Sequence, residues 1–149
     1  MDPTFICHGT YLIENPVLQL LYMTCDIGVS VSVSSNHYLF LDYSKNPIRD
    51  FFETGMRISV STDDGLIFHK SRNALNDEIS KVSLMYRFSS IDISELFRNS
   101  VLMSTYSTTQ KKDMLGEDFA DPTLTNLPPS RINFRERIFQ RTLAAIYDE

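Results

Sequence analysis

The chain has 149 residues, a formal net charge of −5, 42% hydrophobic residues and 22% charged residues, which is ordinary for a soluble globular protein of one domain. The acidic balance argues against a nucleic-acid partner, which would require a basic surface. No apolar run approaches the roughly 20 residues that a bilayer-spanning helix needs. The N-terminus, MDPTFICHGT, lacks the basic region and long apolar core of a signal peptide, so we expect no membrane partner either.

The first strand and the first helix are predicted close to the N-terminus. The apolar run at residues 5–7 is typical of a short strand and ends at His8. Asn15 is a strong N-cap and Pro16 suits the first helical position, so a helix is predicted over residues 16–24.

The two cysteines, Cys7 and Cys25, have neither a metal-binding spacing nor the pattern of a disulfide framework. Each lies in an apolar stretch, where a free thiol usually behaves as a small buried hydrophobic group. We therefore expect two buried thiols and a reducing, cytosolic setting.

The clearest strand is predicted over residues 26–34 (DIGVSVSVS), where apolar and small residues alternate. One face carries only glycine and serine, namely Gly28, Ser30, Ser32 and Ser34. Such a face suits the lining of a ligand cavity or barrel mouth better than a packed interior. Asn46 and Pro47 then predict a helix that continues to about Thr54, and Gly55 supplies its left-handed end.

A third strand, residues 56–61, is followed by two adjacent carboxylates, Asp63 and Asp64. Side chains at a strand end point in opposing directions, so one acid can bind a metal while its neighbour binds another group. In parallel α/β barrels, catalytic groups lie at the carboxyl ends of the strands. Residues 62–65 are equally compatible with a simple turn, because Asp and Gly both suit tight turns.

The second half of the chain is predicted to be helical. Leu75, Ile79, Val82 and Tyr86 form an amphipathic stripe, and Asp77 and Glu78 lie in the first turn of this helix, where acids favour the helix dipole. A capping box is predicted from Asp92 and Glu95, a polar surface loop over residues 116–129, and a last helix over residues 131–147.

The histidines are His8, His37 and His69, and none has the spacing of a metal ligand pair with another. His8 ends a strand, so its ring is expected to project into the same mouth as Asp63. Catalytic zinc usually needs three protein ligands and an open position. The residues of this chain therefore do not complete a zinc site by themselves.

Six segments together match a known family. They are CHG at residues 7–9, NPVLQLLY at 15–22, SSN...LFLDY...NP at 34–47, STDD at 61–64, RNSVLMS at 98–104 and TNLP...R.NFR at 125–135. With these segments the chain resembles the C-terminal part of the AMP deaminases, zinc aminohydrolases with a (β/α)8 barrel. STDD and the HG pair also occur in adenosine deaminases, whereas the LFLDY...NP, RNSVLMS and TNLP segments resemble AMP deaminase.

The resemblance implies roles for particular residues. Asp63 would be the carboxylate ligand of zinc, and Asp64 would bind the substrate and align the attacking hydroxide. Gly65, Leu66 and Ile67 would line the same substrate wall. His8 would act as a general base or electrostatic partner of the zinc-bound water and would not be a zinc ligand. In this family zinc would lower the pKa of a bound water, and the resulting hydroxide would attack C6 of adenine, so that AMP becomes IMP with release of ammonia.

The chain departs from the family pattern at two places. Gly65 stands where the family usually has proline, which loosens the backbone beside the expected zinc ligand. The proline expected just after the second strand is replaced around Val33.

The resemblance also implies a partial domain. The expected fold class is α/β, with residues 1–70 as the last three βα units of a TIM-type barrel and residues 71–149 as a helical C-terminal segment. Three strands cannot close a barrel, and the other zinc ligands are expected on earlier strands, so we expect this chain alone to be inactive. In the complete enzyme we expect AMP as substrate, zinc as cofactor and a homo-oligomer. A fragment of an adenosine deaminase and an inactive remnant with an interaction role are the alternatives.

Overall fold

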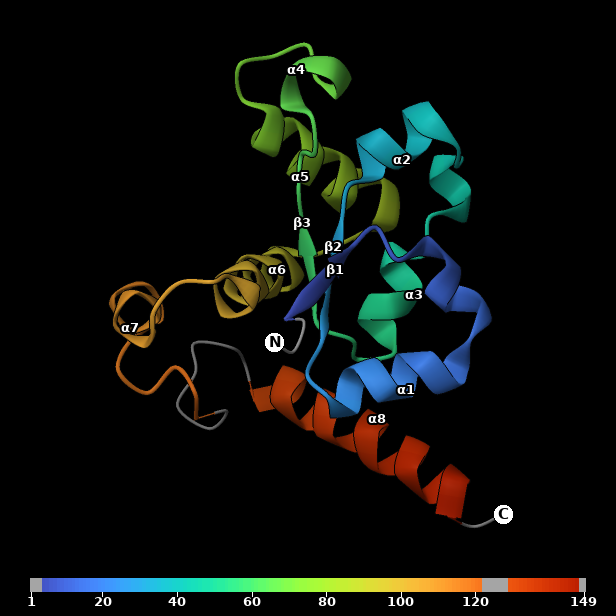
Figure 1. Ribbon diagram of the computed structural model, residues 1–149, viewed down its shortest axis with the longest axis vertical. Coiled ribbons are helices and arrows are strands. Elements are labelled where there is room, and N and C mark those ends of the chain that lie inside the picture. Colours follow the sequence, from blue (N-terminus) through green and yellow to red (C-terminus); the bar gives the residue numbers. More distant parts are fainter. Residues whose placement is uncertain (1–3, 122–128, 148–149) are drawn as a thin grey trace.

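A three-stranded parallel sheet lies at the centre of the protein (Figure 1). The computed structural model describes residues 4–121 and 129–147. Within them the sheet has the order β1 (Phe5–Cys7), β2 (Gly28–Val31) and β3 (Ile58–Val60). Ile6 lies beside Val29, and Val29 lies beside Ile58. Because all three strands run in the same direction, their carboxyl ends lie side by side at one end of the sheet, which we call the carboxyl edge.

Helices make up most of the remaining described structure, as expected for the α/β class. They are α1 (Pro16–Thr24), α2 (Val33–Leu39), α3 (Ile48–Glu53), α4 (Gly65–Phe68), α5 (Ala74–Tyr86), α6 (Ser90–Met103), α7 (Thr108–Leu115) and α8 (Pro129–Tyr147), with 3-10 turns η1 (Thr10–Glu14) and η2 (Tyr43–Lys45). None of the helices in the described ranges is both long enough and apolar enough to cross a bilayer.

The core lies between one face of the sheet and α3. Val29 and Ile58 are fully buried and belong to the same cluster as Ile48, Phe51 and Phe52 of α3. Burying one such side chain contributes roughly 1.5–3 kcal/mol. The alternating valines of the second strand therefore point toward a helix layer, as their period predicts.

The outer edge of β3 is covered by α6. Asn99 Nδ2 of α6 donates to the Ile58 carbonyl over 2.9 Å. Met103 packs on Gly28, where a Cβ atom would lie 2.6 Å from the methionine sulfur. The prediction that this small-residue face lines a cavity is therefore wrong at Gly28, which makes room for a core methionine.

The outer edge of β1 is open in the part of the chain that the structure describes, where β1 pairs only with β2. Cys7 lies in this strand and is exposed. Cys25, which follows the last residue of α1, is exposed as well. The prediction of buried thiols is wrong. Apolar neighbours in the sequence suggest burial, but Cys7 lies in an edge strand and Cys25 at a helix end, where side chains are left uncovered.

The predicted starts and ends of the first helices are largely confirmed. The first helix is observed at Pro16–Thr24, and Asn15 Oδ1 accepts a hydrogen bond from the Leu18 N–H over 3.1 Å. The next predicted helix, α3, begins at Ile48, with Pro47 as its N-cap and the Asn46 side chain accepting from the Ile48 N–H. Gly55 has a φ of 87°, the left-handed conformation expected for it.

Two predicted boundaries are wrong. The second strand ends at Val31, and Val33 and Ser34 belong to α2 instead. The capping box of α6 is formed by Ser89 and Asp92, while Glu95 lies buried within the helix. In the first case a contact with Glu78 of α5 decides where the residues belong, whereas in the second the local pair of Ser89 and Asp92 forms the cap.

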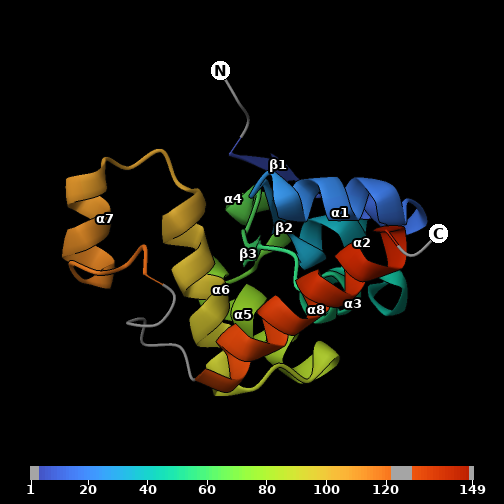
Figure 2. The same cartoon turned by 90° about the horizontal axis from the view of Figure 1, so that it is seen from below.

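The C-terminal region forms two helices, one of which the sequence did not predict. Helix α7 lies within the polar region before Gly116, and α8 begins two residues before the predicted start. Of the predicted loop over residues 116–129, residues 122–128 lie outside the described structure. Figure 2 shows α8 crossing below the sheet, with α6 and α7 to one side.

Candidate functional site

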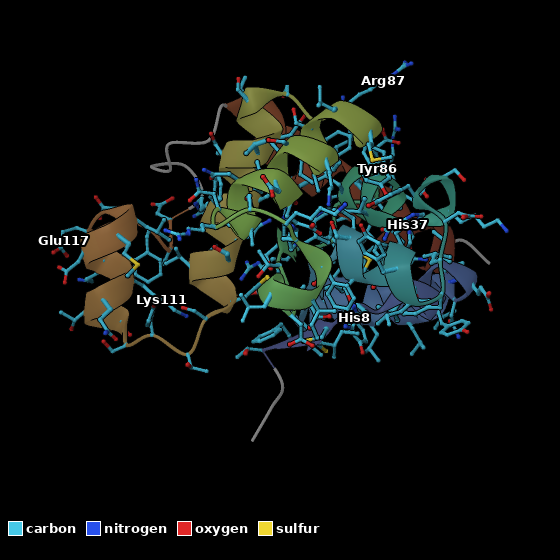
Figure 3. All side chains as sticks on the ribbon, turned by 90° about the horizontal axis from the view of Figure 1, so that it is seen from above. His8, His37, Tyr86, Arg87, Lys111 and Glu117 are labelled. Carbon is cyan, nitrogen blue, oxygen red and sulfur yellow. The ribbon has the colours of Figure 1, made fainter. Side chains whose placement is uncertain are left out.

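Polar side chains from all three strand ends come together at the carboxyl edge of the sheet. His8 follows β1, Asn36 lies in the helix after β2, and Asp63 follows β3. His8 Nδ1 lies 2.7 Å from Asn36 Oδ1, and His8 Nε2 lies 3.6 Å from Asp63 Oδ2. Figure 3 looks onto this end of the molecule, with His8 beside α2 and α4. The structure thus brings the His8 and Asp63 side chains together at the carboxyl ends of the strands, as expected from their positions in the sequence.

Helix α2 supplies the groups that hold this pair. Ser35 Oγ donates to Asp63 Oδ2 over 2.7 Å, one residue before Asn36 contacts His8. The backbone N–H of Asp63 donates to Ser61 Oγ over 3.2 Å. Sequence reasoning missed Ser35, although its position beside Asn36 at a strand end was a usable signal.

His8 and Asp63 both have left-handed backbone conformations, with φ angles of 62° and 53°. Such a conformation costs a residue other than glycine roughly 1–2 kcal/mol. Residues of this kind gather at functional sites, where surrounding contacts hold them. Here the His8 N–H donates to the Ser30 carbonyl over 2.7 Å, and Ser35 and Ser61 hold Asp63.

The contact with Asn36 determines what the His8 ring can do. Asn36 Oδ1 lies at hydrogen-bond distance from His8 Nδ1, which fixes the orientation of the ring and directs Nε2 toward Asp63. The side chains of His8 and Asp63 are each about one-third exposed, at 34% and 32%, so a ligand can reach both. Asn36 Nδ2 is buried without a hydrogen-bond partner among the described residues, which leaves one donor unused at this edge.

The other predicted site residues lie farther out on the surface. Asp64 is the exposed N-cap of α4, and its side chain makes no capping hydrogen bond. Leu66 and Ile67 are 100% and 72% exposed. A Cβ atom on Gly65 would lie 3.3 Å from Ala74 Cβ, so the short helix lies close to the start of α5. The substrate wall assigned to these residues stays a prediction.

A buried polar network anchors α2 from behind. Glu78 of α5 is fully buried and accepts from the Ser34 N–H over 3.0 Å and from Ser34 Oγ. His69 Nε2 lies 3.3 Å from Glu78 Oε2, and Lys81 Nζ donates to Ser34 Oγ over 2.6 Å. The prediction that Glu78 acts on the dipole of its own helix is wrong, because its carboxylate bonds to the first turn of α2.

The described residues do not form a metal centre by themselves. No group of three or more His, Cys, Asp or Glu side chains that could hold a metal ion occurs among them. Asp63 can supply one carboxylate ligand, whereas His8 already contacts Asn36 and Asp63. A zinc site would need further donors.

The protein is thus an α/β protein with a parallel sheet. The polar groups at the carboxyl ends of its strands form a candidate catalytic site. The family model for AMP deaminase matches residues 2–149, so this chain belongs to the AMP deaminase family.

Curated relatives agree with the family match. The chain is 38% identical to the AMP deaminase of Arabidopsis thaliana over 149 residues, which are 95% of this chain and 18% of that protein. It is 37% identical to AMP deaminase 3 of Rattus norvegicus over 150 residues, covering 96% and 20%. It is 41% identical to the AMP deaminase of Saccharomyces cerevisiae over 137 residues, covering 87% and 17%. The chain thus spans about a fifth of the length of these relatives.

Proposed function

We propose that this chain contributes one side of the active site of an AMP deaminase, which converts AMP and water to IMP and ammonia. The observation that carries the proposal is the convergence of His8, Asn36 and Asp63 at one edge of a parallel sheet, in a chain of this family. The relatives named above are AMP deaminases. The substrate is assigned to this chain from their names.

His8 serves in this proposal as the group that moves a proton. Asn36 holds the ring so that Nε2 faces Asp63, the residue that we propose as the zinc ligand. Positioned general bases of this kind contribute about 10²- to 10⁴-fold to a rate. Asp64 would bind the substrate, with Gly65, Leu66 and Ile67 beside it.

Zinc enters the proposal only through Asp63. We propose that Asp63 provides one ligand and that the remaining ligands belong to parts of the enzyme other than this chain. When bound, zinc would supply an activated water for hydrolysis. Ser35 supports the role of Asp63, because its hydroxyl occupies one side of Oδ2 and fixes the direction of the carboxylate.

The sheet supports a place for this chain in a larger barrel. We propose that the three strands are the last three of a (β/α)8 barrel, with a further strand pairing along β1. The open edge of β1 and the exposed Cys7 fit this arrangement, because parallel sheets are normally extended or covered. A homo-oligomeric enzyme in the cytosol completes the proposal.

The isolated chain is expected to lack activity. We expect purified residues 1–149 to release no ammonia from AMP and to retain far less than one zinc ion per chain, because one carboxylate cannot hold the metal. Ammonia release and metal analysis by mass spectrometry measure the two quantities. Zinc bound tightly at a ratio near one would contradict the assignment of the missing ligands to other segments.

A chimeric enzyme tests the proposed reaction. Residues of this chain would replace the matching segment of the Saccharomyces cerevisiae AMP deaminase, to which they are 41% identical. We expect the chimera to deaminate AMP in preference to adenosine. The loss of adenine absorbance measures the rate with each substrate. A chimera that prefers adenosine would support the adenosine deaminase alternative. A folded chimera inactive on both substrates would support an inactive remnant.

A further inference from the structure

A cavity lies at the opposite end of the sheet from His8 and Asp63. It has a volume of about 780 Å³, and its walls include Asp26 and Arg57, which precede β2 and β3. Arg57 directly precedes β3, whereas Asp63 lies beyond its carboxyl end, so the whole length of the strand separates the two residues. A molecule in this cavity is therefore separate from one bound at the carboxyl edge.

Four basic side chains from different elements line this cavity, and we call them the basic cluster. They are Arg57 before β3, Arg98 of α6, Lys111 of α7 and Arg135 of α8. Figure 3 shows Lys111 on the side of α7 that faces α6, with Glu117 on the other side. A net charge of −5 for the whole chain makes such a concentration of positive charge unusual.

The partners of the basic cluster divide it into two pairs. Arg57 Nη2 lies 2.8 Å from Asp26 Oδ1, and Arg135 forms an ion pair with Glu95. Arg98 Nη2 instead donates to the Phe119 carbonyl over 2.7 Å, and Lys111 Nζ donates to the Leu102 carbonyl over 2.7 Å. Within the described residues, Arg98 and Lys111 thus form no ion pair with a carboxylate.

Two acidic side chains line this cavity as well, and one of them, Asp26, is already paired with Arg57. Glu136 also lines it, but one of its oxygens accepts a hydrogen bond from Gln140 in the next turn of α8. Arg98 is half-buried, and this burial lowers its pKa; repulsion from Arg57 and Arg135 adds to the effect, while the Glu95 carboxylate acts in the opposite direction. An anion placed among the guanidinium groups would relieve that repulsion.

We propose that this cavity binds a small phosphate-bearing molecule, with Arg98 and Lys111 as its direct contacts. The planar guanidinium of arginine matches the oxygens of a phosphate group, and lysine adds a point charge. The volume falls in the range of about 300–1,000 Å³ that small-molecule sites occupy. Tyr22, Tyr106 and Phe119 line the same cavity and offer an apolar wall for the rest of the ligand.

Calorimetric titration of the 149-residue chain tests the proposal, with inorganic phosphate, pyrophosphate and AMP as separate probes at constant ionic strength. We expect saturable binding of at least one probe at a ratio of one. Equal affinity for pyrophosphate and AMP would assign recognition to the phosphate groups alone. Tighter binding of AMP would assign a contribution to the aromatic wall. Either result supports the site.

Neighbouring lysines provide the matched variants. Lys111→Gln is expected to weaken binding at least about tenfold, because the variant loses a charged hydrogen bond to the ligand. Lys112→Gln should bind normally, since Lys112 lies 2.7 Å from Glu117 outside the cavity. Arg98→Gln is a second test, read only if circular dichroism shows the fold retained.

Three outcomes would overturn the proposal. The first is the absence of saturable binding to the folded chain. The second is equal weakening in the Lys111 and Lys112 variants, which would indicate nonspecific attraction. The third is binding that survives Lys111→Gln but is lost in Asp63→Asn, which would place the ligand at the carboxyl edge. Because the cavity is separate from His8 and Asp63, the test does not depend on the proposed catalytic function.

Discussion

Replacing Glu78 with alanine is expected to lower the free energy of unfolding by about 3–5 kcal/mol. The carboxylate is fully buried and is the acceptor for both the N–H and the hydroxyl of Ser34. Its removal leaves these donors without their partner and takes away the carboxylate that lies 3.3 Å from the buried His69 ring. A buried group deprived of its hydrogen bond loses about 1–3 kcal/mol, and several groups are affected together. Denaturant unfolding of the isolated chain measures the loss.

The preceding acid in α5 supplies the control. Asp77 accepts from Ser71 in an exposed contact and lies in the first turn of its helix. Asp77→Ala should therefore lose less than about 1 kcal/mol. Glu78→Gln should lie between the two, because the amide oxygen still accepts from the Ser34 N–H. If the alanine variants at 77 and 78 were equally stable, the Glu78 network would have no structural role.

The effect of Glu78 reaches the candidate site through α2. Ser34 is followed directly by Ser35 and Asn36, which contact Asp63 and His8. A shift in the first turn of α2 therefore alters both contacts at once. The buried network is the feature that connects the core of the fold to the geometry of the carboxyl edge.

Local sequence rules predicted those elements whose ends depend on neighbouring residues. Asn15 and Pro16 are sufficient to start α1, because the cap and its acceptor lie three residues apart. Gly55 ends α3 because its own backbone takes the left-handed conformation. The parallel sheet was predictable as well, since short strands separated by helices rarely connect in another way.

Contacts between distant residues account for the errors. The alternation of residues 26–34 continues past Val31, but Glu78, 44 residues away from Ser34, fixes those residues as the first turn of a helix. No periodicity within residues 26–34 contains that information. The exposure of Cys7 likewise depends on which strand pairs with β1, not on the residues beside it.

The candidate site was predictable in part for the same reason. His8 and Asp63 follow strands, so parallel pairing places them together whatever the detailed packing. Ser35 and Asn36 each reach a partner 28 residues away, which depends on where α2 begins. The basic cluster escaped prediction because its members come from four segments that are separate in the sequence.

Replacing His8 with alanine in the chimera is expected to lower kcat by about 10²- to 10⁴-fold while zinc remains bound. The reason is that Asn36 holds the His8 ring with Nε2 facing Asp63, and alanine removes the group that we propose moves the proton. His37→Ala is the matched control, because that ring stacks on Tyr43 with centroids 3.9 Å apart. It should change kcat by less than about tenfold, well below the effect expected from removing a general base.

Asp63→Asn in the same chimera separates metal binding from proton transfer. We expect this variant to lose zinc and activity together, because an amide is a poorer ligand than a carboxylate, while Ser35 still bonds to the side chain. Metal analysis of the folded protein gives a result that does not depend on turnover. Zinc retained with activity lost would make Asp63 a positioning residue for His8 instead of a ligand. Full turnover in both the His8 and Asp63 variants would mean that the carboxyl edge is not the site of the reaction.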